Sequence, residues 1–271
     1  DIPARVLTTS ISSITRRSNG ETWFATNSYG VIVKPVGKPA YQLKHETHPT
    51  VIKEDFVNTT FESRDKTMWI GHRNGLSTID ANNHSSIITL KEGKQDYSNC
   101  DIRHISQDKE GNIWLATDNE GIIRVSGNPL NNKALRYKQY NPTHHNFSIN
   151  DATACMEDYE GRLWAISNSG GLFLYNKEND SFEPKNREYH LPGDRVHAIT
   201  EDDLGGLWLT TDYALVHIIM EKNNDKPQDI SYFTSEDGLG DVLFSPNTTC
   251  KHGKEIFFGS RTSIFSFIPS Q

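Results

Sequence analysis

The chain has 271 residues, a net charge of −7 and 23% charged residues. This acidic balance argues against the basic face that nucleic-acid binding needs, so no nucleic-acid partner is expected. No apolar run reaches the roughly 18 residues of a membrane span, and the three cysteines form no CxxC pair, so we expect no metal and no cofactor.

A repeat runs through the whole sequence. Tryptophan returns at intervals of 44 to 50 residues, and a phenylalanine takes its place in the sixth copy. The six positions are Trp23, Trp69, Trp114, Trp164, Trp208 and Phe257. We interpret each aromatic ring as a buried wedge between neighbouring sheets.

The third copy shows the predicted elements most clearly. Four short segments rich in β-branched and aromatic residues follow one another, separated by Asp, Asn, Gly and Lys. They are residues 102–106, 112–117, 121–126 and 135–140. No segment of the chain has a sustained helical period.

A second motif precedes the tryptophan in three copies. It reads Asp-x-x-Gly-x-x-Trp and begins at Asp108, Asp158 and Asp202. The first copy has Arg17 in the place of Asp, and the second copy has lost both Asp and Gly. We interpret the motif as a tight hairpin, in which Asp bonds the backbone two residues on and Gly takes a positive φ. A calcium loop is the alternative, but the motif lacks the alternating carboxylates that such a loop needs.

Four antiparallel strands every 45 residues or so are typical of a β-propeller blade. We therefore predict an all-β fold with one propeller domain over residues 1–271, built from six blades centred on the six aromatic positions. The last copy has three strands, near residues 248–252, 255–259 and 263–267. The segment ARVLTT, residues 4–9, is expected to supply the fourth. A seven-bladed ring with one blade outside the chain is the alternative.

The predicted topology places the loops between second and third strands on one face, with the connections between blades. These loops are polar and vary from copy to copy, which suits a binding scaffold. Arginines there are suited to carboxylates or sulfates and tyrosines to sugar rings. The candidate ligand-binding residues are Tyr29, Arg73, Asn74, Asp101, Arg103, Asn119, Asn168, Asp194, Arg195, His197, Tyr213 and Arg261.

Two segments carry a resemblance to a known family. ISQDKEGNIWLATDNEGI (105–122) and ITEDDLGGLWLTTDYAL (199–215) resemble the two-component regulator propeller repeat, although Ala214 stands where that repeat has Gly. The segment from 244 to 269 resembles the last blade that precedes a small β-sandwich and the membrane. The chain starts with Asp1-Ile2-Pro3, which we interpret as an excised fragment or a mature ectodomain.

The resemblance implies a role as well as a fold. In that family such propellers are periplasmic sensors of hybrid two-component systems in Bacteroidetes, and they detect oligosaccharides. It implies an oligosaccharide ligand, an adjacent propeller and a membrane-proximal β-sandwich in the same chain, a homodimer, and a histidine kinase elsewhere in the polypeptide. The expected mechanism is a shift in the relative placement of propellers or protomers.

Two other functions remain open. A protein-interaction or dimerisation propeller without its own ligand would use the same faces. A propeller lyase or glycosidase would need a convergent acid/base set, for which His197 with Asp194, Asp101 or Asp151 is the nearest candidate. The pairs His45/His48 and His144/His145 are expected in outer loops, so we predict that the chain itself is not an enzyme.

Overall fold

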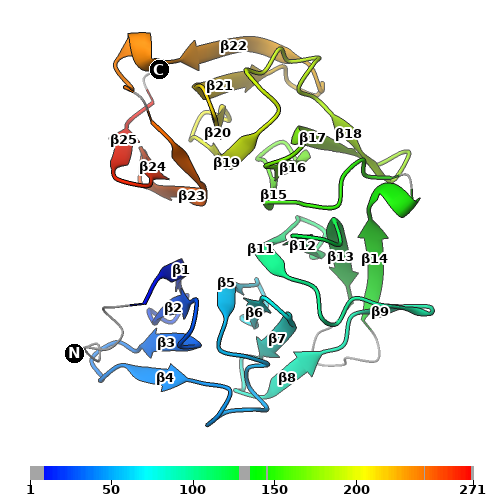
Figure 1. Ribbon diagram of the computed structural model, residues 1–271, viewed down its shortest axis with the longest axis vertical. Helices are drawn as coiled ribbons and strands as arrows, with labels where there is room; N and C mark the ends of the chain where they lie inside the picture. Colours follow the sequence, from blue (N-terminus) through cyan, green and yellow to red (C-terminus); the bar gives the residue numbers. More distant parts are fainter. Residues whose placement is uncertain (1–8, 128–134, 145, 241, 270–271) are drawn as a thin grey trace. The chain divides into compact units, whose positions relative to one another are not determined.

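The structure is a computed structural model that describes residues 9–127, 135–144, 146–240 and 242–269. Within these residues six antiparallel blade sheets follow one another along the chain (Figure 1), five of four strands and a last one of three, in addition to one two-stranded hairpin. In each sheet the hydrogen-bonded order equals the chain order. The protein is thus an all-β, six-bladed β-propeller, as the spacing of the tryptophans predicted. We name the strands of each blade A to D in chain order.

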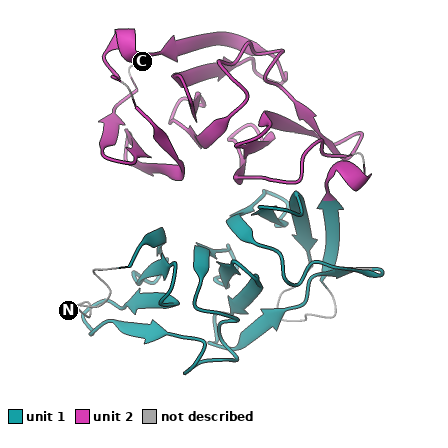
Figure 2. Ribbon diagram, viewed as in Figure 1, with its two compact units in different colours: residues 1–139 teal, residues 140–271 magenta. Residues whose placement is uncertain are grey.

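The chain divides into two compact units, residues 1–139 and 140–271 (Figure 2). Unit 1 contains blades 1 to 3, and the last residue of blade 3 falls in unit 2. The strands of these blades are β1 (Ile11–Arg16), β2 (Thr22–Thr26), β3 (Val31–Lys34) and β4 (Tyr41–Leu43); β5 (Val57–Glu62), β6 (Met68–His72), β7 (Gly75–Ile79) and β8 (Ser85–Ile88); and β11 (Ile102–Gln107), β12 (Ile113–Thr117), β13 (Ile122–Ser126) and β14 (Arg136–Tyr140). A small hairpin, β9 (Lys91–Glu92) and β10 (Gln95–Asp96), lies between blades 2 and 3.

Unit 2 contains blades 4 to 6. Their strands are β15 (Ala154–Glu157), β16 (Leu163–Ser167), β17 (Gly171–Asn176) and β18 (Ser181–Pro184); β19 (Val196–Glu201), β20 (Leu207–Thr211), β21 (Leu215–Met220) and β22 (Pro227–Phe233); and β23 (Phe244–His252), β24 (Glu255–Ser260) and β25 (Ile264–Phe267). Helical structure in the unit includes two single turns, η3 (Pro142–His144) and η4 (Ser235–Asp237). No helix in the part of the chain that the structure describes is long and apolar enough to cross a membrane.

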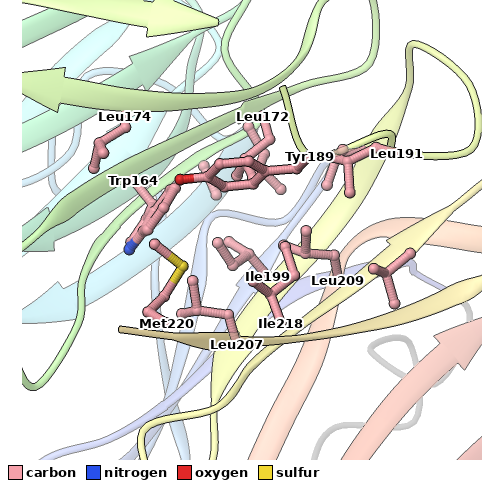
Figure 3. Close-up of a cluster of buried hydrophobic side chains, with 14 of the residues drawn as sticks. Trp164, Leu172, Leu174, Tyr189, Leu191, Ile199, Leu207, Leu209, Ile218 and Met220 are labelled. Carbon is pink, nitrogen blue, oxygen red and sulfur yellow. The ribbon is translucent and has the colours of Figure 1, made fainter. Parts of the chain in front are cut away.

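The repeated tryptophans are buried wedges, as predicted. In unit 1, Trp23 of blade 1 packs with Met68 and Ile70 of blade 2. In unit 2, Trp164 of blade 4 packs with Leu207 and other apolar side chains of blade 5 (Figure 3). In blades 1 to 5 one large buried ring per blade therefore contributes to the apolar area that holds neighbouring sheets together. Blade 6 differs from the prediction: Phe257 is only half-buried, and Ile256 and Phe258 on either side of it enter the core.

The Asp-x-x-Gly motif forms the hairpin between strands A and B, with the predicted positive φ at Gly111, Gly161 and Gly205. The aspartate does more than cap that turn. One oxygen of Asp108 accepts the backbone N–H of Asn112 (2.8 Å), and the other accepts the indole N–H of Trp114 (2.7 Å). Asp158 and Asp202 bind Trp164 and Trp208 in the same way, at 2.9 and 2.8 Å. The predicted bond two residues on is present at Asp202, and all three aspartates also accept the backbone N–H four residues on.

The two copies without this aspartate keep an oxygen for the indole. In blade 2, Ser63 stands six residues before Trp69 and accepts its N–H at 3.0 Å. In blade 1, Glu21 accepts the N–H of Trp23 at 3.3 Å. Blade 6 has Phe257, which carries no such donor. The buried indole thus explains which residues the motif needs, because a buried N–H without a partner is costly.

Strand A carries a β-bulge near its start in four blades. In blade 3, Ile102 pairs with Thr117 and His104 with Ala116, which leaves Arg103 as the extra residue. The extra residues of blades 1, 2 and 5 are Ser12, Asn58 and His197. All four stand eleven residues before the tryptophan of their blade. A bulge re-aims the side chain of its extra residue, so each of these four blades presents one variable side chain at this position.

Three predictions about the chain ends and loops have different outcomes. The first strand of the last blade begins at Phe244, earlier than predicted, and a register shift between Phe244 and Thr249 accommodates Pro246. The proposed extra strand at residues 4–9 lies outside the described residues apart from Thr9, and so does His145. Those two expectations stay predictions.

Candidate functional site

The antiparallel order places the B–C loop of each blade beside the start of its strand A. We call this edge of each blade the B–C edge, and the opposite edge, with the anchored hairpins, the A–B edge. All twelve sequence-predicted site residues belong to B–C loops or to the entry into strand A. Within each unit, the structure brings some of them together.

The unit 2 group forms around His197, the extra residue of the blade 5 bulge. Its Nδ1 lies 2.9 Å from Oδ1 of Asn168 in the B–C loop of blade 4, and its Nε2 lies 2.8 Å from Oδ1 of Asp212 in blade 5. Arg195 lies 3.8 Å from the other oxygen of Asp212 and keeps 63% of its side chain exposed. The imidazole therefore joins the B–C loops of two blades, and a cation stands beside it in solvent.

Tyr213 adds an aromatic surface to the unit 2 group. It follows Asp212 in the B–C loop of blade 5 and is 70% exposed. A Cβ placed on Gly193 would lie 3.2 Å from the tyrosine ring, so the ring packs against the Gly193 backbone. Support for the ring, high exposure and an adjacent arginine suit a ring-shaped polar ligand that bears apolar C–H groups.

The unit 1 group forms around Arg103, the extra residue of the blade 3 bulge. Its guanidinium contacts Asp101 at 3.0 Å and Asp118 at 3.1 Å. Asp101 also accepts the side-chain amide of Asn58 at 2.6 Å. Burial raises the pKa of Asp101, and the charge of Arg103 opposes that rise. Arg103 is thus bound by carboxylates of its own chain, where the sequence suggested an arginine for external anions.

The remaining predicted residues are arranged separately. Arg73 lies over the Phe56 ring at 5.2 Å, with the exposed Asn74 beside it in sequence. Tyr29 is partly buried with the Lys44 ammonium 5.5 Å from its ring. Asn119, Asp194 and Arg261 are exposed. The carboxylate partner of His197 is Asp212, so the suggested pairing of His197 with Asp194 is replaced by one that the sequence analysis missed.

The geometry bears on metal binding and acid/base chemistry. Among the residues that the structure describes, no group of three His, Cys, Asp or Glu side chains is placed to hold a metal ion. Both ring nitrogens of His197 already face partners, and a general base needs one nitrogen directed at a substrate proton. The unit 2 group is therefore better suited to holding a ligand than to transforming it.

Sequence reasoning missed the polar partners Asn58, Asp118 and Asp212 and the support that Gly193 gives. One signal was present for Asn58. It stands eleven residues before Trp69, as Arg103 and His197 stand before their tryptophans. Asp118 and Asp212 each stand four residues after the tryptophan of their blade, so the same register identifies both.

Comparisons with known proteins agree with this architecture. The two component regulator propeller family matches residues 96–119 and 190–213. Histidine kinase P4 of Formosa agariphila is 28% identical over 233 residues, which are 82% of this chain and 16% of the kinase. The chain thus spans about a sixth of the length of that relative.

Solved structures show the same fold. The extracellular domain of the hybrid two component system BT3049 from B. thetaiotaomicron aligns with a TM-score of 0.78 and 22% identity, covering 96% of this chain and 34% of that one. Virginiamycin B lyase from Staphylococcus aureus aligns with a TM-score of 0.61 and 13% identity, covering 95% and 94%. Two segments of the chain, in blades 3 and 5, thus match the two-component regulator propeller family, and the fold around them is a six-bladed β-propeller.

Proposed function

We propose that this propeller is a sensor domain of a hybrid two-component signalling protein. It acts in the periplasm, where it binds an oligosaccharide or relays its binding to a kinase elsewhere in the polypeptide. The similarity to a histidine kinase and to the extracellular domain of a hybrid two component system supports this role. An adjacent propeller and a membrane-proximal β-sandwich complete the signalling chain.

The observation that carries the ligand proposal is the unit 2 group. Tyr213 offers a supported ring face, Arg195 an exposed guanidinium, and Asn168 and Asp212 hold His197 between them. An aromatic face beside hydrogen-bonding groups matches a sugar ring, which presents both C–H and hydroxyl surfaces. The exposed arginine favours a sugar that carries a carboxylate or a sulfate.

The test is calorimetric titration of the chain with neutral and acidic oligosaccharides. Tyr213→Ala should weaken binding of the recognised sugar about tenfold, the effect of losing one stacked ring. Arg195→Ala should weaken acidic sugars more than neutral ones. Tyr159→Ala is the matched control, because Tyr159 is 61% exposed but lies in an A–B hairpin.

The possible outcomes are distinct. Equal effects of Tyr213→Ala and Tyr159→Ala would contradict the location of the site. Turnover of the sugar would contradict a pure sensor and favour a lyase or glycosidase. Absence of binding across the panel would contradict a ligand site contained in this chain.

A second candidate function, a dimerisation or protein-interaction propeller, is favoured by a different observation. Two large apolar side chains stand at neighbouring A–B hairpins of unit 2, Tyr159 at 61% and Leu204 at 64% exposed. The corresponding hairpin tips of unit 1 carry Ser18, Asn19 and Arg64, Asp65. Where such side chains lie together in one patch, the patch often marks a contact surface.

A further inference from the structure

Neighbouring blades are joined at the A–B edge by one repeated hydrogen bond. The last residue of strand A, seven positions before the tryptophan, accepts a backbone N–H from the hairpin of the preceding blade. Glu62 accepts from Ser18 at 2.6 Å, Gln107 accepts from Arg64 at 2.9 Å, and Glu201 accepts from Tyr159 at 2.9 and 3.1 Å. In each case the donor stands five positions before the tryptophan of its own blade. We call each of these bonds a pin.

The three pins differ in charge. Gln107 is neutral at every pH. Glu62 is paired with Arg17 at 3.1 Å, and although burial raises its pKa, the Ser18 and Arg17 bonds outweigh burial and hold the pKa below its ordinary value. Glu201 is 7% exposed, and none of the arginines that the structure describes forms an ion pair with it.

The charged groups around Glu201 work against its ionisation. Asp158 of the blade 4 hairpin and Asp202 of the blade 5 hairpin both lie near it. Arg162, the nearest cation, is held 2.6 Å from Asp158 and donates to the backbone oxygens of Glu221 and Asn224. Lys251 of blade 6 pairs with Asp203 at 2.6 Å and bonds the Tyr159 hydroxyl at 3.2 Å. Each nearby cation therefore has another carboxylate partner.

We propose that the pin between blades 4 and 5 is a proton-operated joint: Glu201 holds the Tyr159 hairpin when it is protonated and releases it when it is ionised. A charged carboxylate accepts the Tyr159 N–H more strongly than a protonated one, but ionised Glu201 is also buried beside two carboxylates. Opening the joint exposes Glu201 to water and relieves that larger cost. The joint between blades 2 and 3 has the same geometry, but Gln107 supplies an amide, which cannot titrate. In the joint between blades 1 and 2, the acceptor Glu62 is a carboxylate, and Arg17 forms an ion pair with it.

The direction of the pH effect follows from linkage. Burial raises the pKa of Glu201 to about 7, with Asp158 and Asp202 adding to the rise and the Tyr159 bond and the charge of Arg162 opposing it. An opened, hydrated Glu201 returns to its ordinary value near 4.5. Opening thus releases a proton, so it becomes easier as pH rises from about 4.5 to 7 and changes little above that range.

The test is amide hydrogen exchange of the whole chain, resolved to single residues by NMR and corrected for intrinsic exchange rates. Protection of the Tyr159 amide should fall roughly 70-fold between pH 5 and pH 8, as closed and open pKa values of about 7 and 4.5 require. The Arg64 amide is the internal control, because Gln107 cannot titrate, and its corrected protection should stay constant. Glu201→Gln should make Tyr159 protection independent of pH.

The result that would contradict the proposed joint can be obtained with the wild-type chain alone. If the corrected protection of Tyr159 follows that of Arg64 across this range, Glu201 does not operate the joint. The comparison is made within the wild-type chain, so a Glu201→Gln protein that fails to fold would not obscure it. It requires no ligand, so its outcome is independent of the proposed sensor function.

Discussion

At the scale of single residues, a buried carboxylate joins a turn to a ring. Asp108 satisfies the N–H of Asn112 with one oxygen and the indole of Trp114 with the other. An ionised carboxylate accepts both bonds at once, and charge strengthens each of them. Local turn chemistry alone would not require Asp at this position, since several residues can cap a tight hairpin.

The substitution Asp108→Ala tests this double role. It should lower the free energy of unfolding by about 2 kcal/mol, because the buried indole N–H of Trp114 loses its acceptor. In a Trp114→Phe background, which copies Phe257 of blade 6, the same substitution should cost about 1 kcal/mol less. Urea unfolding of the wild type, the two single variants and the double variant gives the coupling energy between Asp108 and Trp114. The exposed Asp194→Ala is the control and should change stability by no more than about 0.5 kcal/mol. Equal costs in both backgrounds would show that Asp108 acts on the turn alone.

Another single-residue effect concerns acid. His72 of blade 2 is fully buried, and its Nε2 lies 2.8 Å from the hydroxyl of Ser77. Burial lowers the pKa of His72 to about 3, and the charge of Lys53 adds to the decrease. The folded chain therefore holds this imidazole neutral, while the unfolded chain takes up a proton near pH 6.5.

The contribution of neutral His72 to the free energy of unfolding is present above pH 6.5 and is lost as the pH falls toward 3. Between pH 6.5 and 5 the loss should reach about 2 kcal/mol. His72→Gln should remove that part of the pH dependence when urea midpoints are compared at pH 5, 6 and 7. His84, an exposed imidazole paired with Asp80, is the control for His→Gln at the surface. An unchanged slope in His72→Gln would mean that other groups cause the acid sensitivity.

At the scale of the blade, two ends of the same strand have different tasks. The end of strand A is pinned to the preceding blade, and its start carries the bulge residue that reaches the B–C loops. In blade 5 both tasks belong to β19, through Glu201 and His197. The B–C edge can therefore vary in sequence while the A–B edge keeps the blades together.

Much of the blade could be predicted from sequence. The fixed spacing of Trp with Asp and Gly indicated the strand order, the hairpins and the buried rings, because those features depend on residues within one copy. The partners of His197 come from two blades and stand 29 and 15 positions away. No local pattern brings Asn168 to His197; the packing of blade 4 on blade 5 does. Likewise, the sequence alone suggests that Arg103 is an unpaired cation, whereas in the folded chain Asp101 and Asp118 form ion pairs with it.

At the scale of the whole molecule, the two edges offer different kinds of surface. The B–C edges of blades 4 and 5 carry charged and aromatic groups, and the A–B hairpins of the same two blades carry the exposed Tyr159 and Leu204. This difference separates the two candidate functions. A ligand would be bound at the first edge, and a second copy of the chain would contact the second.

Sedimentation velocity over a wide concentration range tests the second surface. If the chain dimerises through these hairpins, a Tyr159→Ser and Leu204→Ser double variant should weaken the dimer at least tenfold, since burying two such side chains is worth several kcal/mol. A double variant at the B–C edge, Tyr213→Ser with Arg195→Ser, is the control and should leave the dimer unchanged. A wild-type chain that stays monomeric, or a dimer insensitive to the hairpin variant, would contradict this surface.

The anchored hairpin also has a consequence for protein engineering and for evolution. The aspartate, the ring and the pin residues lie within about ten consecutive residues of one copy. The next B–C loop begins a few residues after the ring. Recombination that cuts inside strands B and C would exchange a whole B–C loop and leave these anchors intact. A library of loops exchanged at those junctions would explore new specificities on an unchanged scaffold, one copy at a time.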